Sequence, residues 1–210
     1  IKIAEITRTQ TGKRKFGYAF FAIDPLTGDL LHVEVFDKTG ADSFKAFLLS
    51  LRAQGIRPRR IITDLASSYS EVIEEVLGKR VLHHHCLFHF KQNISKHLDD
   101  AFGRDFRIEK CERRLHLKKQ LAKLIFDIVD HKSRKTCRRR YQDLQPMKEA
   151  YLAVWPKSKC VFDCLARHFD KIINARENHK VILTNNPAEL IIRNFTQHYK
   201  TMAGFETIDS

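Results

Sequence analysis

The chain has 210 residues, of which 43% are hydrophobic, so it can bury a core and is not a disordered polypeptide. Lys and Arg total 38 against 25 Asp and Glu, and the resulting formal charge of +13 is typical of a protein that binds a polyanion such as nucleic acid. No apolar run approaches the roughly 20 residues of a membrane-spanning helix, so we expect no contact with a membrane.

The N-terminal residues and the cysteines indicate what kind of protein the chain comes from and in which compartment it lies. It begins without Met, directly in a strand-like alternation, and we interpret it as a fragment of a longer protein. Its five Cys residues are odd in number and lack the spacing of a disulfide framework, which indicates a reducing compartment.

The first 85 residues alternate between strand and helix signals. Residues 1–37 carry three apolar runs separated by turns, which predict an antiparallel meander. Beyond them the patterns predict a helix over 42–54, a strand over 59–63, a helix over 68–77 and a strand over 81–85. This β-β-β-α-β-α-β order is that of a ribonuclease H-like core. We therefore expect an α/β fold with a five-stranded mixed sheet flanked by helices.

The character of the chain changes to long, charge-laced helices after this core. Residues 104–180 contain 21 Lys and Arg against 10 Asp and Glu, which places +11 of the total charge there. Pro146 and Pro156 are expected to divide the region into at least three helices. We assign residues 1–102 to the first part of the core, 103–180 to a basic all-helical insertion and 181–210 to the last part of the core.

Two acids stand where strands and helices meet. Asp64 follows a short apolar strand, and Glu189 lies in the first turn of a helix that begins after an Asn-Asn-Pro turn. Carboxylates gathered at a strand end are ligands that Mg²⁺ prefers, and two such ions can drive phosphoryl transfer. The plainer alternatives are that Asp64 caps the next helix and that Glu189 stabilises its own helix dipole.

Three segments in this order resemble motifs of DDE-type insertion-sequence transposases. Residues 61–64 (Ile-Ile-Thr-Asp) are similar to the strand that ends in the second catalytic Asp of that family. Residues 184–189 (Thr-Asn-Asn-Pro-Ala-Glu), with the Gly-Phe element of 202–207, resemble the segment of the third acid. Residues 86–89 (Cys-Leu-Phe-His) are similar to the Cys-x-x-His element of Mutator-like transposases.

This resemblance implies a function. It implies an enzyme that cleaves DNA at transposon ends and joins them to target DNA, with Asp64 and Glu189 holding two Mg²⁺ or Mn²⁺ ions. It also implies DNA contacts from Arg193 and Lys200, assembly as a homodimer or larger complex, and a cytoplasmic, nucleoid-associated location in a prokaryote. The rival hypotheses are a catalytically silent DNA-binding descendant of a transposase and a related ribonuclease H-like nuclease.

The first acid of the motif is missing. The best-matching position of the first strand holds Ala4 where the family has Asp. Ala4 is then an introduced substitution or a natural inactivation, or another acid replaces it. Glu5 would point to the opposite face of the strand, and Asp24 lies in a turn after the second strand. With only two acids, we expect metal affinity and catalysis to fall sharply.

Cys86 and His89 have metal-ligand spacing but make only half of a zinc site. Cys160, Cys164 and His168, four residues apart, could supply the other half; the alternative is that the Cys residues are small core side chains and that His89 caps or packs locally. The run from His83 to His85 is not expected to form one site, because alternate strand residues face opposite ways.

The basic insertion has two interpretations. Its charge either keeps helices solvated or binds the DNA backbone, and its position next to the candidate acids favours DNA, with Arg138, Arg139 and Arg140 as the densest run. Trp155, the only Trp, is expected to anchor the core rather than to stack on an unpaired base.

Overall fold

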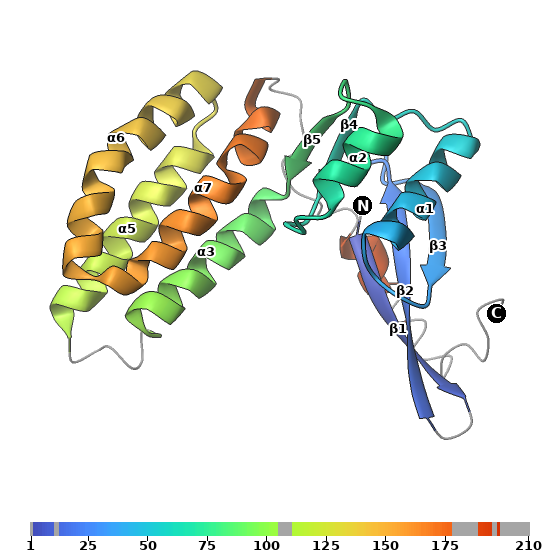
Figure 1. Cartoon of the computed structure of the whole chain (residues 1–210), viewed down its shortest axis with the longest axis horizontal. Helices are drawn as coiled ribbons and strands as arrows, with labels where there is room; N and C mark the ends of the chain where they lie inside the picture. Colours follow the sequence, from blue (N-terminus) through green and yellow to red (C-terminus); the bar gives the residue numbers. More distant parts are fainter. Residues whose placement is uncertain (1, 11–12, 105–110, 178–188, 195–196, 198–210) are drawn as a thin grey trace. The chain divides into compact units, whose positions relative to one another are not determined.

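The computed structural model describes residues 2–10, 13–104, 111–177, 189–194 and 197, and it shows a mixed α/β protein (Figure 1). The chain divides into two compact units. The first comprises residues 1–83 together with 184–210, and the second comprises residues 84–183. The last segment of the chain therefore belongs with the first, across a unit of 100 residues.

The strands and helices of the first unit follow the predicted order. Strand β2 lies between β1 and β3 and pairs antiparallel with both, which confirms the meander. The elements are β1 (Lys2–Gln10), β2 (Lys13–Ile23), β3 (Leu30–Phe36), α1 (Ala41–Ala53), β4 (Arg60–Thr63), α2 (Tyr69–Leu77) and β5 (Leu82–His85).

The prediction of one five-stranded sheet is not met in the described residues. They form a three-stranded sheet, β1-β2-β3, and a separate two-stranded sheet, β4-β5. Strands β4 and β5 have only four residues each, so each can form only a short ladder. Local sequence patterns predict where each strand lies, but the pairing of β1 with β4 into one sheet would depend on tertiary contacts.

Strand β2 has a different neighbour on each face. Phe20 and Ala22 face the larger core, where they pack with residues of α1, β4 and α2 such as Phe47 and Ile61. The alternate residues Ala19 and Phe21 pack instead with Ile192, which belongs to the helical segment 189–194. Apolar residues on both faces explain why residues 16–23 are almost continuously hydrophobic.

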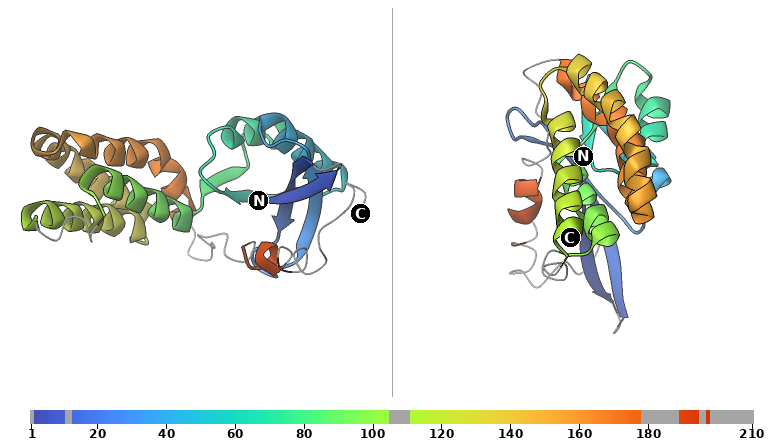
Figure 2. Two further views of the ribbon diagram at one scale, coloured as in Figure 1. Left: turned by 90° about the horizontal axis from the view of Figure 1, so that it is seen from below. Right: turned by 90° about the vertical axis from the view of Figure 1, so that its left-hand side faces the viewer.

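The second unit is helical, and its four long helices run side by side in both views of Figure 2. Its helices are α3 (Leu87–Phe102), α5 (Glu112–Asp130), α6 (Arg134–Val154) and α7 (Lys159–Ile173), with short 3₁₀ helices η1 (Pro156–Ser158) and η2 (Asn174–Glu177). No described helix is long and apolar enough to cross a membrane.

Two details of the second unit differ from the expectations. Helix α3, expected to belong to the first part of the core, packs on α5 and α7, and the helical unit begins near residue 84. Pro146 does not end a helix, because α6 runs through it as one helix of 21 residues. Both Pro146 and Gln142, whose carbonyl loses its helical donor, are exposed, so solvent can reach the interrupted turn.

Candidate functional site

Asp64 follows the last residue of β4 and is half-buried. Its Oδ1 accepts a hydrogen bond of 3.1 Å from the backbone N–H of Ala66. Helix α2 begins later, with Ser68 at its N-cap position, so the interpretation of Asp64 as the cap of that helix is wrong. Burial and the charge of Asp64 together raise the pKa of Tyr69, which places this phenol within electrostatic reach of the carboxylate.

Glu189 is the first residue of the helical segment 189–194 and belongs to the same unit as Asp64. It is half-buried, and its Oε1 is shielded from solvent. One turn further along, Ile192 is buried against Ala19 and Phe21 of β2, which fixes this helix to the sheet. The turn at 184–188 lies outside the described residues.

Ala4 lies on β1, where its backbone pairs with Ala19 of β2. Ala19 in turn packs with Ile192 of the Glu189 helix, so the backbone of Ala4 is paired with a residue that contacts this helix.

Glu5 and Asp24, the two acids considered in place of an acid at position 4, lie at different distances from that position along the strands. Glu5 pairs with Tyr18 and occupies the neighbouring register position of β1. Asp24 follows the end of β2, five residues beyond Ala19, which corresponds to about 17 Å in an extended chain. Its Oδ1 also accepts a hydrogen bond of 2.8 Å from the backbone of Leu26, which ties it to its own turn.

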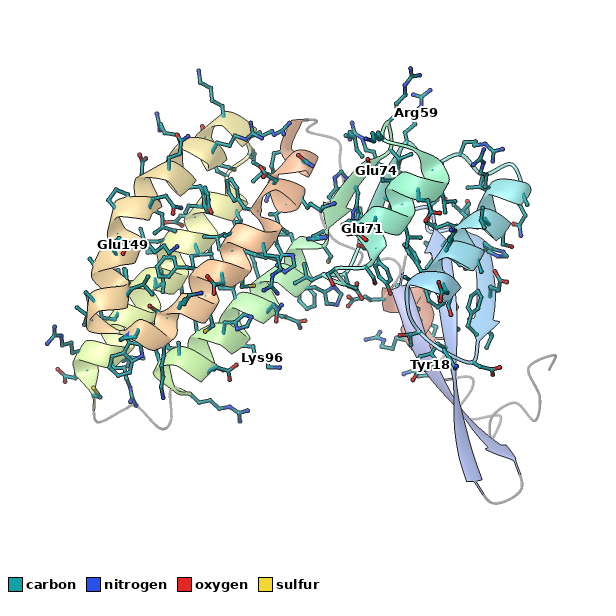
Figure 3. All side chains as sticks on the ribbon, in the orientation of Figure 1. Tyr18, Arg59, Glu71, Glu74, Lys96 and Glu149 are labelled. Carbon is teal, nitrogen blue, oxygen red and sulfur yellow. The ribbon has the colours of Figure 1, made fainter. Side chains whose placement is uncertain are left out.

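Many acids among the described residues lie at the surface. Glu71 and Glu74 project from α2, Glu149 projects from α6, and all three are exposed (Figure 3). Asp64 and Glu189 are half-buried within one unit, as are Asp24 and Glu34 of the same unit. Among the described residues, no group of three or more His, Cys, Asp or Glu side chains is arranged to hold a metal ion.

A chain of buried polar side chains that the sequence pattern did not predict lies beside Asp64. The hydroxyl of Thr63 donates to the carbonyl of Asp64 at 2.9 Å and lies 2.8 Å from Nε2 of His83. Nδ1 of His83 lies 3.3 Å from the hydroxyl of Ser70 in the first turn of α2. The available signal was the His run itself, which places a polar side chain on a strand next to β4.

The candidate zinc ligands remain dispersed over separate contacts in the helical unit. Cys86 is fully buried at the start of α3, and His89 packs edge-on against Phe88. The thiol of Cys160 lies 3.2 Å from the carbonyl of Lys157 and 3.6 Å from that of His97, while burial raises the pKa of Cys164 to about 11. Cys86 and Cys164 are thus small core side chains, one of the two alternatives for the Cys residues, whereas Cys160 is only half-buried.

A second His contact was also missed. His168 of α7 lies against His85, with 3.1 Å between their Nδ1 atoms, and both rings are buried. Burial, with smaller contributions from the neighbouring His168 and Lys171, lowers the pKa of His85 to about 3. The pKa of His168 is also lowered, again chiefly by burial. The pair is therefore neutral near pH 7 and pins α7 to the start of the helical unit.

The basic run of α6 divides by its contacts. Arg138 and Arg139 are exposed, and Arg138 makes an exposed ion pair of 3.5 Å with Asp170. Arg140 is half-buried and donates to the carbonyl of Asp127 at 2.9 Å. A surface hollow of about 630 Å³ lies at the N-terminal end of α6, lined by Arg134, Lys135, Thr136, Arg138, Arg139 and Gln142.

This hollow combines two kinds of positive potential. Four of its six lining residues carry a full charge, and the first turn of α6 adds the partial charge of a helix N-terminus. Elsewhere, Arg193 is exposed on the Glu189 helix, whereas Lys200 and the Gly-Phe element lie outside the described residues.

Trp155 is half-buried and packs against the core of the helical unit. Its ring stacks on Phe102 with 5.7 Å between centroids, and its Nε1 donates to the carbonyl of Ala101 at 2.7 Å. The guanidinium of Arg114 lies 5.8 Å from the same ring. These contacts support the role of core anchor over that of a base-stacking platform.

Comparison with known proteins adds no relative. No protein-family model matches the chain, and no curated protein matches it in sequence.

Proposed function

We propose that the chain is the catalytic core of a DDE-type transposase, a ribonuclease H-like unit that cleaves and joins DNA and carries a basic helical insertion. The observation that carries the proposal is the return of the Glu189 helix to the unit of Asp64. The two acids are separated by 125 residues in sequence and by the whole second unit. Such a return is what a core interrupted by an insertion requires.

The acids have the properties that a magnesium site needs. Both are carboxylates, both are half-buried, and Mg²⁺ prefers such oxygen ligands. Asp64 is held in one orientation by the N–H of Ala66 and follows a strand of the core. Glu189 lies on a helix that Ile192 anchors to β2. Each carboxylate is therefore mounted on a packed element, so little order has to be gained when an ion binds.

Asp64 and Glu189 would hold the divalent ions, with an acid at position 4 between them. When bound, a pair of such ions activates the attacking oxygen and stabilises the leaving one in an in-line displacement at phosphorus. The protein residues keep the carboxylates in place and position the DNA. Ala4 removes one of three ligands, which supports a strongly reduced activity in this sequence.

The second unit supplies a surface that suits DNA. Arg138 and Arg139 point their charges at solvent around a hollow that also contains Arg134 and Lys135. Exposed Lys and Arg neutralise phosphates and release the counterions condensed on DNA, a term that does not depend on base sequence. We therefore propose that the helical unit binds the DNA backbone and that the first unit carries out the phosphoryl transfer.

The test is restoration of the missing acid. Ala4→Asp should give Mg²⁺- or Mn²⁺-dependent nicking and strand transfer on duplex DNA that carries the transposon ends. Ala4→Asn, whose side chain has nearly the size of Asp, should stay inactive because the ion needs an anionic oxygen. The added variant Ala4→Asp/Asp64→Asn should lose the activity again.

A second function is favoured by one observation, the Ala at position 4 of β1. If folded Ala4→Asp remains inert with correct DNA ends and either metal, while the chain still binds DNA, the protein is a silent DNA-binding descendant. Cleavage without joining would instead support a related nuclease. Robust activity of the chain with Ala4 would contradict the alignment and favour Glu5 as the third acid.

A further inference from the structure

We propose that His83 is a positioning residue for Asp64, acting through Thr63 by way of a buried chain of hydrogen bonds that includes Ser70. The inference rests on the proposed role of Asp64 as a metal ligand. It deepens that role, because it names the groups that hold the acid in the orientation that an ion would need.

One assignment of donors and acceptors, with the ring of His83 taken as neutral, satisfies these hydrogen bonds together. The Thr63 hydroxyl donates its only proton to the Asp64 carbonyl, so toward His83 its oxygen can only accept. Nε2 of His83 must then carry a proton and donate it. Nδ1 of the neutral ring is left as an acceptor, and the Ser70 hydroxyl is the donor that faces it. All three side chains are thereby used in one consistent direction.

Burial gives this chain its stiffness. Thr63 is completely buried and His83 is 7% exposed, so water does not compete for the central hydrogen bond. A hydrogen bond in such surroundings is costly to break, because each partner would remain buried without a substitute. The chain also spans three elements, since His83 lies on β5, Thr63 ends β4 and Ser70 lies in the first turn of α2.

The chain fixes Asp64 from its backbone side. Thr63 holds the carbonyl of Asp64, while the N–H of Ala66 holds its Oδ1, so both ends of the residue are tied. If Thr63 loses His83, its hydroxyl can rotate and release the carbonyl, and the turn that supplies the Ala66 N–H loses its anchor. Outer partners of metal ligands commonly contribute about 10-fold or more to metal affinity in this way.

A pair of substitutions separates positioning from packing. In His83→Gln the side-chain amide reaches the place of Nε2 and can donate to Thr63, whereas in His83→Asn it reaches only the place of Nδ1. Both variants remove the ring. A second pair changes the hydroxyl itself, since Thr63→Ser keeps the donor and Thr63→Val removes it at the same size.

Two measurements are made on the chain and on each variant. Amide hydrogen exchange of Ala66 reports the hydrogen bond to Asp64, with the amide of Val76 in α2 as the reference for general loosening. Mn²⁺ binding, followed by electron paramagnetic resonance of the free ion, reports the metal site, with Asp64→Asn as the control.

We expect His83→Asn and Thr63→Val to weaken Mn²⁺ binding about tenfold and to speed Ala66 exchange roughly fivefold relative to Val76. His83→Gln and Thr63→Ser should stay close to the unsubstituted chain in both. Equal effects within each pair, or Ala66 and Val76 exchange rising together, would mean that the residues only pack, and would overturn the inference. If one His83 variant fails to fold, the Thr63 pair gives the same comparison.

The two proposals fail in different ways. If Asp64→Asn binds Mn²⁺ as well as the unsubstituted chain does, Asp64 is not a metal ligand and the proposed function is wrong. The exchange of Ala66 still decides whether His83 and Thr63 position Asp64.

Discussion

The exposed arginines of α6 give a quantitative prediction about DNA binding. Replacing Arg138 and Arg139 together by Ala removes two charges that point into solvent at the rim of the α6 hollow. Both side chains are exposed and lie outside the core of the helical unit, and the ion pair of Arg138 with Asp170 is of the exposed type that contributes little stability. The double variant should therefore fold normally and bind DNA more weakly.

The size of the effect follows from counterion release. Each phosphate contact on duplex DNA contributes about 0.9 to the slope of log affinity against log salt, so losing two contacts lowers that slope by about 1.8. Between 200 mM and 50 mM salt this difference multiplies the affinity ratio of the two proteins by about 12. The deficit of the variant is thus greatest at low salt and shrinks as salt rises.

The assay is fluorescence anisotropy of a short duplex titrated with protein at four or more salt concentrations. Arg140→Ala is the matched control, since it removes the same charge from the same run. Its guanidinium is already engaged with the carbonyl of Asp127, so the salt slope should change by less than one contact and thermal stability should fall instead. A slope that is unchanged in the double variant, or lowered equally by Arg140→Ala, would refute this placement of the DNA surface.

Two further predictions concern the helical unit. Trp155→Phe keeps the stacked ring but removes the N–H that donates to the carbonyl of Ala101. The free energy of unfolding, measured by urea denaturation, should therefore fall by about 1–3 kcal/mol, while DNA affinity stays unchanged. A loss of DNA affinity in a fully stable variant would instead indicate base stacking. Because burial lowers the pKa of His85 to about 3 and also lowers that of His168, protonation favours the unfolded chain, and the thermal midpoint should fall as pH drops below about 6.5. His168→Leu should show a smaller fall over the same pH range, and an equal fall would show that His168 does not contribute to this dependence.

The order of strands and helices in the first unit was predictable because it depends on local patterns. Alternation, turn residues and helical spacing gave all five strands and both helices in the observed order. Pairing between strands is not local, and the single five-stranded sheet predicted from strand order is two sheets in the described residues. Likewise, α3 belongs to the second unit because of its contacts with α5 and α7, which the local sequence does not show.

Pro146 and His83 show that the effect of a single residue also depends on tertiary contacts that local patterns do not predict. Pro146 was expected to break a helix, but its position on an exposed face lets α6 continue through it. The candidate acids could be named from sequence, since each follows a recognisable strand or turn. The hydrogen bonds around His83 could not, because His83 and Thr63 are 20 residues apart and meet only through the β4-β5 ladder.

Anomalous diffraction from crystals of the chain soaked in Mn²⁺ will show whether Asp64 and Glu189 share a divalent ion. We expect an anomalous peak bounded by both side chains, with carboxylate oxygens within roughly 4 Å of each other, as two ligands of one ion must be. The same crystals of Asp64→Asn should lose the peak. Side chains held on opposite faces of the sheet, with Mn²⁺ bound elsewhere or not at all, would contradict the account.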